Sequence, residues 1–162
     1  SDGGVIPNPT ALQLADIAIS SAEKARLTAG IKEPKVAFLS FSTKGSADGE
    51  SVTKVREAIE ILKDRNVDFD FDGEMQLDAA IVPEVAAIKA PGSKVAGYAN
   101  VLIFPDLNSG NIGYKLTQRL AKAKALGPLI QGLASPVHDL SRGCSVNDIV
   151  EVVAITAVES SQ

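Results

Sequence analysis

Two short, uninterrupted apolar runs constrain the fold of this chain more than any other feature. The first, Lys35–Phe41, follows Pro34 and is ended by a polar stretch, and the second, Asn100–Phe104, is ended by Pro105. Runs of this length without alternation are typical of strands that are buried on both faces. Because helix-like segments alternate with such runs, the sequence predicts an α/β fold, with a mainly parallel sheet sandwiched by helices and right-handed crossovers.

The helical segments carry recognisable start and stop signals. Thr10 and Gln13 form a capping box before a helix expected over residues 10–29, and Gly30 should end it. Ser51–Asn66 has its apolar residues on one face, which predicts an amphipathic surface helix whose charges are solvated. The other expected elements are a short helix that starts at Pro83, a strand at Leu126–Gln131 and a last helix with its apolar face over Ile149–Val158.

The segment Asp68–Gly73 alternates Asp with Phe and matches the first half of a calcium-binding loop. We reject calcium, because Ala79 stands where the closing bidentate glutamate belongs. The alternation instead predicts a strand that shows its carboxylates to one side. Asp72–Glu74 and Asp78 would then lie at or just past its carboxyl end, where open α/β sheets bind ligands, and the loop over residues 42–51 is a second candidate.

Composition limits the classes of function. With 162 residues, 45% of them hydrophobic, the chain has enough material for one domain with a sizeable core. The net charge of −4 argues against a nucleic-acid or anionic-membrane surface, so an anionic ligand must be held by the local basic groups around Arg119 and Arg142. The single Cys144 and the lack of a leader or an apolar run of about 20 residues suit a reducing cytoplasm.

A polar turn, Asp139–Cys144, runs directly into the last helix. Ser145 can accept a hydrogen bond from the Asp148 amide and Asp148 can return one, so the segment has the pattern of a capping box. A helix N-terminus preceded by an arginine, here Arg142, is also a ready site for a phosphate or a developing oxyanion. Spacing alone leaves the capping and binding interpretations open.

A further candidate site is the segment Leu107–Tyr114, which is expected to be a turn between a strand and a helix that carries Arg119. A turn with Asn108, Gly110 and Asn111 leaves amide groups free to cradle a phosphate. Taken alone this is a weak signal, since many such turns bind nothing.

Four segments together resemble the C-terminal half of the phosphate acetyltransferases: Asp72–Ala80, Asn100–Asn108, Gly110–Leu116 and Asp139–Ser145. The resemblance implies reversible transfer of an acetyl group between coenzyme A and phosphate. It also implies a two-domain α/β enzyme related in fold to the isocitrate dehydrogenases, with its active site in the interdomain cleft. Residues 1–162 would be the C-terminal region of that longer enzyme, which we expect to be a homodimer.

The resemblance also implies roles for individual residues. The family's aspartate that matches Asp148 takes the thiol proton of coenzyme A, the arginine that matches Arg142 binds and polarises acetyl phosphate, and the serine that matches Ser141 positions the reacting groups. An arginine that matches Arg119 is associated with coenzyme A. We expect further substrate contacts from Asn108, Gly110, Asn111, Gly143 and Cys144. No metal is expected, and no cofactor beyond coenzyme A, which is itself a substrate.

Three alternatives stay open at this point. The region resembles the C-terminal part of large malic enzymes, so it could be a non-catalytic domain that senses acetyl-CoA; it could also transfer a longer acyl group. Cys144 could act as an acyl-accepting nucleophile, although a thiol at this place more often packs. His138, six residues away, is interpreted as a loop residue.

Overall fold

The computed structural model describes residues 1–161 and contains a parallel sheet of three strands in the order β2-β1-β3. The strands are β1 (Lys35–Leu39), β2 (Asp70–Met75) and β3 (Val101–Ile103). Central β1 pairs with β2 from Lys35 and with β3 from Val36, and its last four residues are buried. The predicted α/β class with a parallel sheet is therefore confirmed.

The bounds of the helices are α1 (Ala11–Ala29), α2 (Glu50–Lys63), α3 (Leu77–Ile81), α4 (Pro83–Lys89), α5 (Leu107–Leu120) and α6 (Val146–Ser160). Helices α1, α2, α4 and α6 begin and end close to the expected positions, whereas α3 was not expected and α5 begins earlier than expected. The Thr10–Gln13 capping box is present, Gly30 ends α1 with a φ of 66°, and Pro83 occupies the first turn of α4. Short-range capping chemistry thus sets these boundaries.

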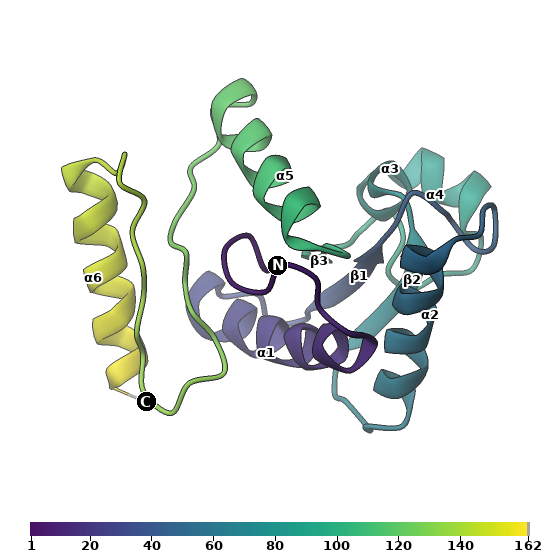
Figure 1. The fold of residues 1–162 in the computed structure, drawn as a ribbon, viewed down its shortest axis with the longest axis horizontal. Coiled ribbons are helices and arrows are strands. Elements are labelled where there is room, and N and C mark those ends of the chain that lie inside the picture. The colour runs from purple at the N-terminus through teal and green to yellow at the C-terminus, as the bar shows by residue number, and fades with distance from the viewer. Residues whose placement is uncertain (162) are drawn as a thin grey trace.

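Helices cover both faces of the sheet (Figure 1). Alternate residues of β1 point to opposite faces, so Phe38 packs with α1 and α2, while Leu39 packs with α3 and α4. The first face also buries Leu14 and Leu62 completely, and the second buries Met75. Residues 121–145 then lead away from this unit to α6, which contacts α1.

The predicted strand at Leu126–Gln131 is wrong. Its only β contact among the described residues is an isolated antiparallel bridge between Leu129 and His138. Pro128 has no N–H to donate to a ladder, and Gly127 has a φ of 107°, which breaks an extended run.

The predicted turn at Leu107–Tyr114 is also wrong, because these residues form the first half of α5. The Asp106 carboxylate caps the helix by accepting the Ser109 N–H at 2.8 Å. Gly110 is needed for close packing, since a Cβ there would lie 2.5 Å from the Asp2 carbonyl oxygen. An aspartate N-cap therefore outweighs the glycine and asparagine content of the segment.

Strand β2 extends further than the Asp–Phe alternation predicts. Asp72 and Glu74 lie inside the strand instead of past its end, and only Asp78 follows it, in α3. The pairing with β1 shifts register between Ala37 and Leu39, which lets the strand continue to Met75.

Membrane insertion through a helix is not supported for residues 1–161, because none of their helices combines the length and apolar character that a bilayer span requires.

Candidate active site

The turn before α6 has the capping geometry that the sequence predicts. Ser145 Oγ accepts the Asp148 N–H at 3.2 Å, and the Ser145 N–H donates to Asp148 Oδ2 at 2.7 Å. The preceding turn is closed by a hydrogen bond of 3.0 Å from the Cys144 N–H to the Ser141 carbonyl oxygen. The Gly143 N–H donates to Ser141 Oγ at 3.2 Å. The capping interpretation is confirmed, and it leaves Asp148 Oδ1 without a hydrogen-bond donor among the described residues.

The same contacts fix the charge of Asp148. The backbone N–H of Ser145 lowers the pKa of the Asp148 carboxyl, followed by the Ser145 side chain and by the charges of Lys124 and Arg119. A carboxyl with a lowered pKa is ionised at neutral pH, so it can accept a hydrogen bond or a proton.

Two helix ends meet near this carboxylate. Figure 1 shows the C-terminal end of α5 and the N-terminal end of α6 on the same side of the molecule. Lys124, just past α5, forms an ion pair with Glu151 in the second turn of α6. Arg119 lies near enough to Asp148 to affect its pKa. Its positive charge therefore acts on the Asp148 carboxylate across the end of α5.

The Arg142 guanidinium is exposed and pairs with no carboxylate in residues 1–161. A free guanidinium next to a helix N-terminus offers donors in the fork geometry that suits phosphate or carboxylate oxygens. Cys144 is partly buried and Ser141 is exposed on the same turn. The turn thus offers an exposed guanidinium six residues before the ionised carboxylate of Asp148.

Asn108, Gly110 and Asn111 are not brought to this turn. They lie in the first half of α5, and Asn108 is eleven residues from Arg119, a rise of roughly 17 Å along the helix axis. The Gly110 N–H donates to the Asp106 carbonyl oxygen, and the Asn111 side chain donates to the Gly3 carbonyl oxygen at 2.9 Å. These groups are used inside the fold, so the predicted site divides into two parts.

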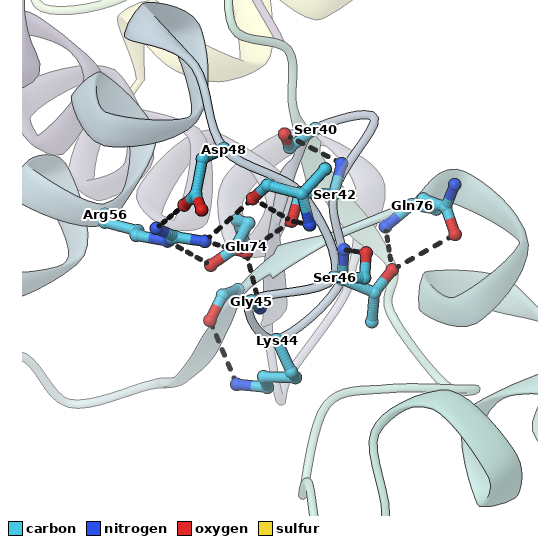
Figure 2. Close-up of polar contacts among 12 residues, drawn as sticks. Ser40, Ser42, Lys44, Gly45, Ser46, Asp48, Arg56, Glu74 and Gln76 are labelled. Atoms are coloured by element: carbon cyan, nitrogen blue, oxygen red, sulfur yellow. Dashed lines mark hydrogen bonds and ion pairs between the residues drawn. The ribbon is translucent and has the colours of Figure 1, made fainter.

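A buried polar network that the sequence did not reveal lies at the carboxyl edge of the sheet (Figure 2). Glu74 is only 4% exposed and accepts hydrogen bonds from the Ser42 hydroxyl at 2.8 Å and the Gly45 N–H at 2.9 Å. Arg56 donates to both Glu74 carboxylate oxygens at 3.1 Å and to Asp48 at 2.8 Å. The prediction that the charges of this helix are solvated is therefore wrong for Arg56.

The network determines the protonation of Glu74. Burial alone would raise the pKa of the Glu74 carboxyl, but the hydrogen bonds from Arg56, Gly45 and Ser42 outweigh it and lower the pKa to about 2. Lys44 of the same loop pairs with Asp72. The loop over residues 42–51, a candidate for binding in the sequence, uses polar groups of residues 42–48 to hold itself against β2.

A cavity of about 740 Å³ does not coincide with the turn. It lies between the N-terminal segment, α5 and residues 123–132, and most of its surface is apolar. Of the predicted site residues it is lined by Gly110. A phosphate needs donors and positive charge, so the turn at Ser141–Asp148 remains the better candidate site.

Comparisons with known proteins show the family of the chain. The phosphate acetyltransferase of Clostridium acetobutylicum is 64% identical over 162 residues, which cover 100% of this chain and 48% of the relative. That of Treponema pallidum is 60% identical, covering 99% and 48%. The structure of a phosphotransacetylase from Streptococcus pyogenes superposes with a TM-score of 0.93 and 54% identity, over 99% of this chain and 48% of that one.

A more distant structure, a branched-chain phosphotransacylase from Enterococcus faecalis, gives a TM-score of 0.78 and 25% identity over 96% of this chain and 57% of that one. The chain thus spans about half the length of the curated relatives it matches. The family model described as phosphate acetyl/butaryl transferase matches residues 1–157. This chain belongs to the phosphate acetyl/butaryl transferase family.

Proposed function

We propose that a protein containing this chain transfers an acetyl group reversibly between coenzyme A and inorganic phosphate. The observation that carries the proposal is the turn into α6, which holds the exposed Arg142 six residues before the ionised Asp148, in a chain whose curated relatives are named phosphate acetyltransferase. Arg142 supplies a place for an anionic acyl phosphate, and Asp148 supplies a proton acceptor.

The proposed step uses Asp148 as the base. A thiol has a pKa of about 8.5, so it is mostly protonated at neutral pH, and a carboxylate within hydrogen-bond reach assists its attack. Asp148 Oδ1 takes the thiol proton while the sulfur forms a bond to the acetyl carbon. The bond from that carbon to the phosphate oxygen breaks, and inorganic phosphate leaves. Arg142 stabilises the charge on the carbonyl oxygen and the leaving phosphate, and Ser141 positions the acetyl phosphate.

The remaining parts of the proposal concern the whole protein. Residues 1–162 are the C-terminal region of a longer two-domain enzyme, and a second half completes the active site in the cleft. The enzyme is a cytoplasmic homodimer, and coenzyme A is a substrate, with no further cofactor. The length of the curated relatives, of which this chain matches about half, supports the two-half organisation.

The first prediction is that this chain, joined to its N-terminal half, makes acetyl-CoA from acetyl phosphate and coenzyme A. The expected result is an increase in thioester absorbance that depends on both substrates. A protein that binds acetyl-CoA without phosphate-dependent turnover would instead support the sensor alternative.

The acyl group is tested in the same assay by replacing acetyl phosphate with butyryl phosphate or isobutyryl phosphate. We expect a higher kcat/KM with the acetyl compound, because identity to the acetyltransferase of Clostridium acetobutylicum is 64%, against 25% to the branched-chain phosphotransacylase. A preference for butyryl phosphate or isobutyryl phosphate would favour the longer-acyl alternative.

The second prediction concerns Arg119 at the end of α5. Arg119→Ala should raise the KM for coenzyme A several-fold and the KM for acetyl phosphate much less, because it removes a binding charge remote from the acyl carbon. Initial rates with each substrate varied in turn measure the two constants. Arg65→Ala, which removes an arginine paired with Asp16 outside the site, is the control. Equal changes for both substrates would contradict the assignment.

A further inference from the structure

At the C-terminal end of α6, the end opposite the turn, lies a buried charge cluster that the proposed mechanism does not use. The Glu159 carboxylate of α6 has a side chain only 3% exposed, and its Oε2 lies 2.8 Å from Lys24 Nζ of α1 and 3.1 Å from His138 Nε2. The His138 side chain is 1% exposed. Neither Glu159 oxygen, nor His138 Nε2, has a partner with hydrogen-bond geometry in the described chain, so the electrostatic contacts with these two neighbours are what offset the burial of the carboxylate.

The backbone around His138 fixes which ring nitrogen faces Glu159. The Ile130 N–H donates to His138 Nδ1 at 3.2 Å, so this nitrogen acts as an acceptor. In a neutral imidazole the other nitrogen then carries the hydrogen, and that nitrogen is Nε2, which faces the carboxylate. The Leu129–His138 bridge holds the same backbone segment. His138 therefore lies in the loop between α5 and α6, as the sequence predicts, but its ring is buried, with Nδ1 bonded to the backbone and Nε2 close to Glu159.

A short segment of chain, from His138 to Ser145, connects this cluster to the turn. Glu159 lies near the C-terminal end of α6, about 20 Å along the axis from Val146, at a rise of about 1.5 Å per residue. His138 contacts that end, while Ser145 caps the other end. The seven residue steps from His138 to Ser145 can span at most about 25 Å, so the connection between the two ends of α6 is short. Figure 1 shows this segment running beside α6.

We propose that His138, Glu159 and Lys24 form a buried clamp that holds the Ser141–Cys144 turn in register with the N-terminal end of α6. A shift of His138 along the helix would be transmitted by this short segment to Ser141 and Arg142. His138 and Glu159 are then positioning residues for the acyl transfer. The positioning role of His138 and Glu159 rests on the proposed function of the turn. The existence of the clamp does not depend on that function.

Cys144 provides a test of the clamp that is independent of activity, because it is the single cysteine of this chain and lies in the turn. The rate of its alkylation by iodoacetamide reports how often the turn opens. His138→Ala and Glu159→Ala should each raise that rate about tenfold, and the double variant should raise it no further than the larger single effect. His138→Gln, which can place an amide N–H near the position of Nε2, should largely restore the slow rate.

The matched control is Glu60→Ala, which removes an exposed carboxylate paired with Lys63 on α2. It should leave the alkylation rate unchanged. Circular dichroism before each measurement shows that the variants are folded, and Glu159→Gln replaces Glu159→Ala if the latter unfolds. An unchanged rate in the folded His138 and Glu159 variants, or additive increases in the double variant, overturns the clamp.

The positioning role is tested with the protein that carries both halves. His138→Ala should lower kcat by about ten- to a hundredfold and leave the KM for coenzyme A unchanged, because a misplaced turn disturbs the acyl centre but not Arg119. His138→Gln should recover most of the loss. An unchanged kcat overturns the positioning role. If the unsubstituted protein transfers no acyl group, the proposed function and the positioning role both fail, and the alkylation rates still decide the clamp.

Discussion

Asp148→Asn is expected to lower the kcat of acetyl transfer by about 10²- to 10⁴-fold in the protein that carries both halves. Asparagine keeps the size of the side chain and an oxygen that can accept the Ser145 N–H, so the cap survives with at most about 1 kcal/mol of stability lost. It cannot take the thiol proton. Steady-state rates and thermal midpoints of the same preparations separate the two effects.

Ser145→Ala is the matched control for the cap. It removes the hydroxyl that accepts the Asp148 N–H, and keeps both the Asp148 carboxylate and the Ser145 N–H. We expect about 1 kcal/mol of lost stability and nearly unchanged turnover per folded molecule. If Asp148→Asn behaves in this way too, melting lower but turning over normally, then Asp148 is only a cap and the base lies in the other half of the enzyme.

The strands could be predicted well where a proline marks one end of an apolar run. Pro34 and Pro105 bracket the two buried apolar runs, and the observed β1 and β3 lie within them. Strand β2 was harder to predict, because its register shift against β1 depends on packing against a neighbour. At α5, the cap by Asp106 decided the structure, whereas the sequence interpretation followed the glycines and asparagines after it.

The candidate site was predictable where it is local in sequence. Ser145 and Asp148 are three residues apart, and their capping box forms as expected. The buried ion pairs were not predictable. Glu74 and Arg56 are eighteen residues apart, and His138 and Glu159 twenty-one, so only the fold reveals that they meet. A charged residue on an amphipathic helix or an alternating strand is also assigned to the solvent-exposed face unless its buried partner is known.

The Glu74 network should make the largest single contribution to stability among these sites. Glu74→Gln removes the negative charge of a buried carboxylate that pairs with Arg56. We expect the free energy of unfolding at pH 7 to fall by about 3 kcal/mol, which is near the lower end of the losses found when one partner of a buried ion pair is removed. Urea unfolding of this chain and of the variant measures it. Asp48→Asn, at the 87% exposed partner of Arg56, is the control and should cost at most about 1 kcal/mol.

The pH dependence of the unfolding free energy tests whether the negative charge of Glu74 causes this stabilisation. The pKa of Glu74 is lowered from 4.5 to about 2 in the folded chain, so its stabilising effect is complete well above pH 4.5 and is lost as the pH falls towards 2. The difference in unfolding free energy between the unsubstituted chain and Glu74→Gln should therefore shrink by about 2 kcal/mol between pH 7 and pH 3. A difference that stays constant over that range would mean that Glu74 contributes through packing and hydrogen-bond geometry, and not through its ionised form.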